Sequence, residues 1–231
     1  MYVKLKWILV LLLCINFSSY AQKTSEVKFS LAPVFGNIPF ELGAKYFPFN
    51  KVDTIKFETL KFYISTIQLL KNGNVVYAEL KSFHLVDVEN KSSMTISLFP
   101  ETKINFDEIN FNLGIDSITN VSGAMGGDLD PTKGMYWTWQ SGYINLKLEG
   151  VSNACPTLKN KFEFHLGGYI TPYNSLQKIQ IKVNSIEHVK IYFDAKLFFS
   201  SIDLTTQNQV MSPNQQAVDL SVLISKCFYT K

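Results

Sequence analysis

The sequence predicts an all-β protein, with one β-sandwich or jelly-roll-like domain and a short C-terminal helix. Three observations indicate this class. Apolar and polar residues alternate in many short segments, turn residues separate those segments, and no long helical pattern lies between them. Aromatic residues make up 14% of the chain, and they favour half-buried pleated surfaces. No Pro/Ser-rich linker, charge block or internal repeat divides residues 22–231, so we expect a single domain there.

The clearest alternation lies in two segments. Apolar residues occupy the even positions of Lys161–Leu166 and the odd positions of Lys178–Val183, which is the period of a β-strand. The segment from Ile144 onward alternates in the same way, and Asn72-Gly73-Asn74 predicts a hairpin turn. Weaker strand patterns cover Val27–Val34, Thr54–Leu70, Asn74–Glu79, Ser82–Val88, Thr95–Phe99, Asp107–Ile115 and Val189–Phe199.

The C-terminal region follows a different period. Leu220, Leu223, Ile224 and Cys227 recur at helical spacing after Ser212-Pro213-Asn214. We therefore expect one closing helix in this region.

The N-terminus predicts export. Met1–Lys6 carries two lysines, an apolar run from Trp7 continues to Phe17, and Ser19-Tyr20-Ala21 places small residues where a signal peptidase cuts. The run is too short to span a membrane, and no later segment approaches roughly 18 consecutive apolar residues. We expect residues 1–21 to be a cleaved signal peptide and the mature protein to be periplasmic or extracellular.

Charge and motifs argue against several functions. Removing Lys4 and Lys6 with the signal changes 22 Lys+Arg against 19 Asp+Glu to 20 against 19, and such near-neutrality disfavours nucleic-acid binding. Every basic residue is lysine, so bidentate arginine contacts to phosphate or carboxylate are absent. The sequence also lacks a Gly-x-Ser-x-Gly elbow, a His-Glu-x-x-His pair, a P-loop and a dinucleotide fingerprint. We therefore expect no enzymatic activity.

Two cysteines remain after the signal peptide is removed, Cys155 and Cys227. In an oxidising compartment they could form one disulfide bridge. Two separate thiols are equally compatible with the sequence.

Trp137 and Trp139 precede the alternating segment that begins at Ile144. Even positions of that segment face the core, so an unbroken strand would place both tryptophans on the polar face. Exposed neighbouring tryptophans would indicate a reactive or metal-binding site. A bulge or bend at Gly142 would instead return both rings to the core.

The histidines give two candidate ligands. His165 lies on the polar face of its predicted strand, beside Gly167-Gly168, where a backbone or ligand can approach closely. His84 shares its face with Val86, which is typical of a hydrogen-bonded core histidine. We assign no role to His188, which lies in a predicted turn.

Three carboxylates surround one loop, Asp116, Asp128 and Asp130. Oxygen ligands of this kind could hold calcium. The spacing lacks the third ligand and the glycine of an EF-hand loop, however, and stabilisation of turns by the aspartates is the alternative.

Six segments run in order over most of the mature chain: Phe83–Asp87, Leu113–Ser117, Gly127–Pro131, Gly134–Trp139, Gly142–Tyr143 with Leu148–Gly150, and Phe164–Gly168. Together they resemble the MbnP family, whose members are exported β-sandwich proteins linked to methanobactin and copper handling. In characterised relatives a partner di-haem enzyme of the MauG-like class oxidises a tryptophan to kynurenine, which forms a copper site with histidine.

The resemblance implies a set of site residues. Trp137 is the first candidate for oxidation, Trp139 is the second, and His165 is the first candidate imidazole ligand, with His84 as a further metal ligand. Copper(I) accepts a few soft or imidazole donors, so such a sparse site is chemically reasonable. One related copper protein has a histidine two residues after its modified tryptophan, where this chain has Trp139.

Two other functions remain open at the level of sequence. Trp137, Trp139 and Tyr143 could form an apolar platform in a non-metal surface adhesion or glycan-binding module. Alternatively, the tryptophans could be core residues of a purely structural envelope domain.

Overall fold

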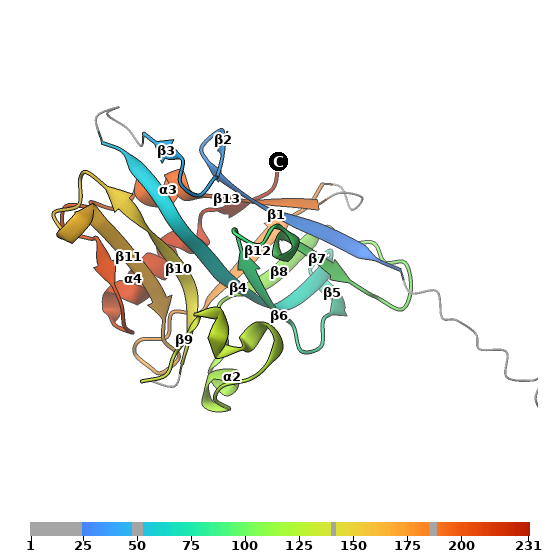
Figure 1. The fold of residues 1–231 in the computed structure, drawn as a ribbon. Helices are drawn as coiled ribbons and strands as arrows, with labels where there is room; N and C mark the ends of the chain where they lie inside the picture. Colours follow the sequence, from blue (N-terminus) through green and yellow to red (C-terminus); the bar gives the residue numbers. More distant parts are fainter. Residues whose placement is uncertain (1–24, 48–52, 140–141, 185–188) are drawn as a thin grey trace, which may run out of the picture.

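Two β-sheets pack face to face across a large apolar core in the computed structural model (Figure 1). The structure describes residues 25–47, 53–139, 142–184 and 189–231. This architecture, with a helix close to the C-terminus, confirms the predicted β-sandwich. The predicted signal peptide and His188 lie outside the described residues.

The smaller sheet joins segments that are far apart in the sequence. Its order is β15-β13-β1-β2, with β7 also paired to β1. β1 runs parallel to β13, with Phe29 opposite Val189, and the other pairs are antiparallel. The strands are β1 (Val27–Phe35), β2 (Ile38–Pro39), β7 (Thr95–Leu98), β13 (Val189–Asp194) and β15 (Phe228–Tyr229).

The larger sheet has the order β12-β8-β4-β10-β11-β14, with β3, β5 and β6 also paired to β4, and β9 to β10. β4 pairs with different strands along its length, and its register with β8 shifts between Ser65 and Gln68, where Thr66 has a φ of 54°. The strands are β3 (Lys45–Tyr46), β4 (Ile55–Lys71), β5 (Asn74–Ala78), β6 (Phe83–Asp87), β8 (Glu108–Leu113), β9 (Tyr136–Trp137), β10 (Gly142–Ser152), β11 (Lys161–Gly167), β12 (Gln177–Lys182) and β14 (Gln209–Val210).

The predicted hairpin turn is present between β4 and β5. Lys71 pairs with Asn74, and the two residues between them, Asn72 and Gly73, both have positive φ. This conformation matches the twist of the flanking strands.

The described residues also form three short α-helices: α2 (Ser117–Val121), α3 (Ala195–Phe199) and α4 (Gln215–Ser225). α4 is the predicted C-terminal helix, and the Asn214 side chain accepts a hydrogen bond from Ala217 N at its start. The prediction of one strand over Val189–Phe199 is wrong in its second half. The Asp194 carboxylate accepts from the backbone N–H groups of Lys196 and Gly36, so the chain turns into α3 there.

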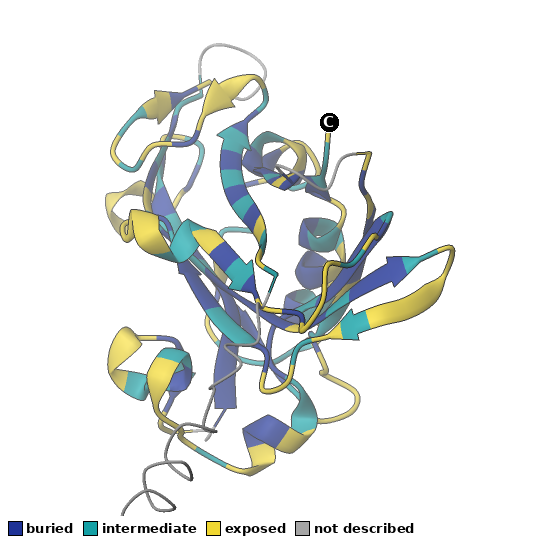
Figure 2. Cartoon of the chain, turned by 90° about the vertical axis from the view of Figure 1, so that its right-hand side faces the viewer, coloured by how far each residue is buried: buried dark blue, intermediate teal, exposed yellow. Residues whose placement is uncertain are grey.

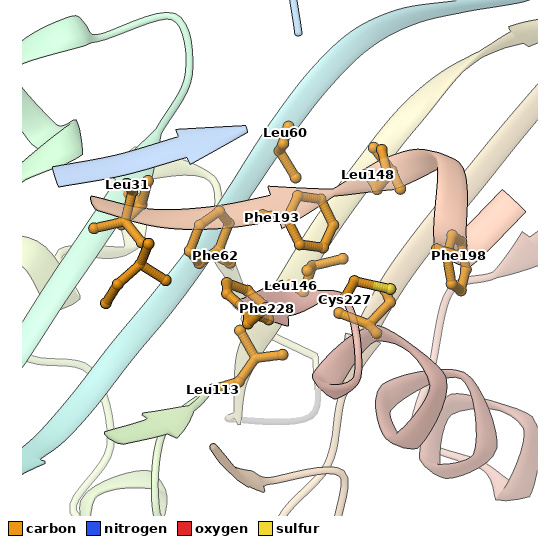
Figure 3. Close-up of a cluster of buried hydrophobic side chains, with 14 of the residues drawn as sticks. Leu31, Leu60, Phe62, Leu113, Leu146, Leu148, Phe193, Phe198, Cys227 and Phe228 are labelled. Atoms are coloured by element: carbon orange, nitrogen blue, oxygen red, sulfur yellow. The ribbon is translucent and has the colours of Figure 1, made fainter. Parts of the chain in front are cut away.

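The main core fills the space between the sheets. Phe62 of β4 lies against Phe193 of β13 and Phe228 of β15 (Figure 3), with ring centroids 6.0 and 5.6 Å away. Leu146 and Leu148 of β10 face the same core, as the alternation predicted. Buried and more exposed positions alternate along strands such as β1 (Figure 2).

The two cysteines are not bonded to each other. Cys155 and Cys227 are free buried thiols, so the possible disulfide bridge is not formed and the alternative of separate thiols holds. Burial raises the pKa of Cys155 to about 11 and that of Cys227 to about 12. Such thiols stay protonated at neutral pH and act as small apolar side chains.

A second, smaller apolar cluster lies between the large sheet and the loops that precede β9. Its buried members are Tyr63, Leu85, Ile115, Leu129, Met135, Trp137, Tyr143 and Ile144. These loops carry the short 3₁₀ turns η2 (Gly127–Leu129) and η3 (Pro131–Lys133); two further turns are η1 (Lys91–Met94) and η4 (Leu158–Asn160). In the part of the chain that the structure describes, no helix is long and apolar enough to cross a membrane.

Candidate functional site

Trp137 and Trp139 have opposite environments. Trp137 pairs with Gly142 between β9 and β10, and its side chain, 7% exposed, belongs to the second apolar cluster. Trp139 follows β9 and is 66% exposed. The two ring centroids are 6.1 Å apart. The core interpretation therefore holds for Trp137, and the exposed interpretation holds for Trp139.

The bulge or bend expected at Gly142 occurs at a different residue of β10. β10 pairs with β11 as Ile144 with Gly167 and then as Leu146 with Leu166, so the bulge is at Asn145. The buried Asn145 side chain accepts from Ile115 N and donates to Ser175 Oγ. These two hydrogen bonds fix the bulge and explain why alternation alone could not locate it.

The double glycine allows two close approaches, as its sequence predicted. A Cβ at Gly167 would lie 2.6 Å from Trp137 Cζ3, so the indole rests directly on the β11 backbone. At Gly168, where φ is 124°, a Cβ would lie 2.3 Å from the carbonyl oxygen of Tyr173 and 2.9 Å from Pro213 Cβ. Only glycine fits both positions without movement of these neighbours.

His165 shares a face of β11 with Gly167, because side chains two residues apart point to the same side of a strand. It is 7% exposed, and its Nε2 lies 2.6 Å from Glu149 Oε1 on β10. The expected neighbour Glu163 is not its partner. The hydrogen bond from His165, together with Lys147 3.5 Å from the same oxygen, lowers the pKa of Glu149 to about 2.

His84 and Trp137 line different clefts. Its Nε2 is 2.7 Å from Glu79 Oε2, so the predicted hydrogen bond is present, but the predicted core position is wrong. The side chain lies half-buried because it borders a polar cleft of about 400 Å³, which Lys61 and Asp128 also line. The structure does not bring His84 together with the tryptophans in one cleft.

The three acidic loop residues have separate structural roles. Asp116 accepts from Thr119 N at the start of α2, and Asp130 accepts from Thr132 N at the start of η3. Asp128 accepts from Leu85 N and pairs with Lys133 at 2.6 Å. These contacts match the turn-stabilising interpretation. In the described ranges, no group of three or more His, Cys, Asp or Glu side chains is arranged to hold a metal ion.

Tyr143 does not belong to an exposed aromatic platform, which corrects that expectation. Its ring is 1% exposed, and its hydroxyl donates toward the carbonyl oxygens of Gly123 and Leu129 while it accepts from Met125 N. Tyr143 packs in the second cluster because these loop groups surround it.

A cleft that the sequence reasoning missed opens beside Trp137. It has a volume of about 290 Å³. Its walls come from the β9–β10 hairpin, the loop after β11 and the residues before α4: Trp137, Gly142, Gly168, Tyr169, Ile170, Thr171, Pro172, Tyr173 and Pro213. The aromatic and proline content of Tyr169–Tyr173, next to the double glycine, was the available signal.

The structure is thus a two-sheet β-sandwich in which a tryptophan rests on a glycine of the strand that carries a buried histidine. The chain belongs to the MbnP family, whose model matches residues 24–212. It also resembles the solved structure of MbnP from Methylosinus trichosporium, with a TM-score of 0.60 and 14% identity over 85% of this chain and 87% of that one. No curated protein matches the sequence.

Proposed function

We propose that this protein is an exported copper-binding member of the MbnP family, without enzymatic activity, whose site joins His165 to an oxidised tryptophan. One observation carries this proposal. The indole of Trp137 rests on Gly167, two residues from His165 on the same face of β11. Family membership supports the same pairing of tryptophan and histidine.

The donors present suit a sparse copper(I) site. Nε2 of His165 is engaged by Glu149, which leaves Nδ1 as the ring nitrogen that a metal ion would use. The carboxylate of Glu149 orients the ring, as partners of metal-bound histidines commonly do. An indole nitrogen is a poor ligand, whereas kynurenine carries a free aromatic amine and a ketone. Copper(I) binds with few ligands, and the site offers few.

The oxidation requires a partner, for which we propose a MauG-like di-haem enzyme supplied with peroxide. The indole C2–C3 bond breaks as two oxygen atoms are added, and two molecules of peroxide are reduced to water. Hydrolysis then releases the formyl carbon as formate. The net change to the side chain is the loss of one carbon and the gain of one oxygen.

Trp137 is the proposed oxidation target, and Trp139 is the alternative. Trp137 has the closer relationship to the histidine strand, whereas Trp139 is far more accessible. Trp139 also occupies the position at which one related copper protein has a histidine. We therefore expect one protein ligand fewer and weaker copper binding than in that relative.

The test is to produce the mature chain in the periplasm of a host, with and without a co-encoded di-haem peroxidase. Intact mass would reveal the exchange of one carbon for one oxygen, and peptide mapping would identify the modified residue. Copper(I) stoichiometry is measured anaerobically by competition with a chromogenic chelator. We expect modification and copper uptake only in the co-expressed sample.

Three substitutions make the assignment specific. Trp137→Phe should abolish modification and copper uptake, and His165→Gln should abolish uptake but retain modification. His84→Gln, at the other histidine that the structure describes, is the matched control and should change neither. An unmodified chain that takes up no copper in either sample would refute the proposal.

A further inference from the structure

The residues that line the cleft beside Trp137 carry no formal charge. Residues 117–127, 134–146, 166–177 and 204–218 contain no Asp, Glu, Lys or Arg. The structure brings these four segments together. Ser117 Oγ donates to Tyr169 O, Asn145 Nδ2 donates to Ser175 Oγ, and Pro213 lies against Gly168. A ligand in the cleft meets no formal charge from these segments, so the cleft favours an uncharged ligand.

The walls of the cleft combine flat apolar surfaces with free hydroxyl groups. Tyr173 is 41% exposed and Ile170 is 65% exposed. Among the described residues, the side-chain hydroxyls of Tyr169, Thr171 and Tyr173 make no hydrogen bond to the protein. A ligand that suits both features needs apolar faces and many hydroxyl groups of its own.

The loop that forms the cleft is held in place before any ligand arrives. Ser175 N donates to Gly168 O at 3.0 Å, and Tyr173 N donates to Ile170 O at 2.8 Å. The Ser117 hydroxyl fixes Tyr169 O from α2 at 2.8 Å. A cleft held in this way loses little conformational entropy on binding.

We propose that this cleft binds a neutral carbohydrate chain. Sugar rings with equatorial hydroxyls have apolar faces that stack on tyrosine and tryptophan, and the hydroxyls at their edges bond with groups such as those of Thr171 and Tyr173. The volume of about 290 Å³ lies near the lower limit of ligand pockets, about 300 Å³. The cleft therefore holds part of a chain, and the remainder extends toward the exposed ring of Trp139. This binding requires neither copper nor oxidation of a tryptophan.

The test uses the unmodified mature chain in EDTA, so it is independent of the copper proposal. Cellohexaose and chitohexaose serve as neutral probes with equatorial hydroxyls, hexagalacturonate as the anionic probe, and an anilinonaphthalene dye as a purely apolar aromatic probe. Calorimetry and tryptophan fluorescence report binding. We expect at least one neutral hexasaccharide to bind and hexagalacturonate not to bind.

The variants separate stacking from hydrogen bonding. Tyr173→Ala and Trp139→Ala should each weaken saccharide binding by about tenfold. Tyr173→Phe and Thr171→Val, which keep size but lose a hydroxyl, should weaken it about three- to tenfold. Phe99→Ala removes an exposed aromatic ring outside the cleft and should have no effect. Circular dichroism and thermal melting establish that each variant is folded.

Three results would overturn the proposal. The first is that no neutral hexasaccharide binds to the folded wild-type chain. The second is saccharide binding that Tyr173→Ala and Thr171→Val leave unchanged, since the saccharide would then occupy another surface. The third is binding of the dye alone, unaffected by loss of the hydroxyls, which would define an apolar pocket.

Discussion

Trp137 and Gly167 are packed so closely that a single methyl group between them would overlap the indole: a Cβ on Gly167 would lie 2.6 Å from Cζ3 and 2.9 Å from Cη2. The contact fixes a β9 side chain on the β11 backbone. It links the second apolar cluster to the strand that carries His165. The position of the tryptophan thus depends on the absence of a side chain at residue 167.

Gly167→Ala should displace Trp137 and destabilise the fold. The added methyl would also lie 2.7 Å from the carbonyl oxygen of Tyr143, so we expect a loss of about 1–3 kcal/mol in the free energy of unfolding. Denaturant titration followed by tryptophan fluorescence measures it. Gly126→Ala is the matched control, because a Cβ there meets nothing within 4 Å. Equal stability of the two variants would show that the contact is not tight in solution.

Glu149→Gln should flatten the acid limb of the stability profile. The hydrogen bond from His165 lowers the pKa of the Glu149 carboxyl from 4.5 to about 2 in the folded protein. The resulting stabilisation is fully present above about pH 4.5 and is lost as the pH falls toward 2. The loss amounts to at most about 3 kcal/mol. Unfolding free energies measured from about pH 2.5 to about pH 6 test this, because most of the loss falls within that range. Glu101→Gln is the exposed control. A profile unchanged by Glu149→Gln would contradict the assignment.

Tyr143→Phe should loosen the loop between α2 and β9. The hydroxyl serves three backbone groups, of Gly123, Met125 and Leu129. Its removal leaves them without this partner, so we expect a destabilisation of about 1–3 kcal/mol. Hydrogen exchange should become faster at the amide of Met125. Unchanged exchange there would mean that water replaces the hydroxyl without cost.

Both thiols should react only after unfolding. Cys155 and Cys227 are buried and unpaired, and burial raises their pKa values. A thiol reagent added to the native protein at about pH 8, close to the pKa of a free thiol, should label neither cysteine. In denaturant without reductant it should label both. Failure to label the denatured chain would instead indicate a disulfide bridge.

Strand positions were predictable from the sequence where one face of a strand is buried. β11 and β12 follow the alternation of Lys161–Leu166 and Lys178–Val183 almost residue for residue. The end of β13 was not predictable in this way. Asp194 stops the strand through hydrogen bonds to Gly36 and Lys196, and Gly36 lies far away in the sequence.

The candidate site was predictable as a set of residues but not as an arrangement. Double glycine predicted a close approach, yet the sequence did not specify that Trp137 would make it. His165 was placed on the correct face, but its partner, Glu149, lies on a neighbouring strand whose register depends on the Asn145 bulge. Bulges and strand registers arise from tertiary contacts, which alternation within one segment does not record.

The parallel pairing of β1 with β13 and the antiparallel pairing of β13 with β15 make completion of the smaller sheet a late event during synthesis. The residues of β1 have no neighbour in β13 until residue 189 has been translated. Phe228 of β15 enters the core later still, after α3 and α4 have been translated. Closing so long a loop is slow. The nascent polypeptide therefore remains without its finished sandwich until β15 has been translated.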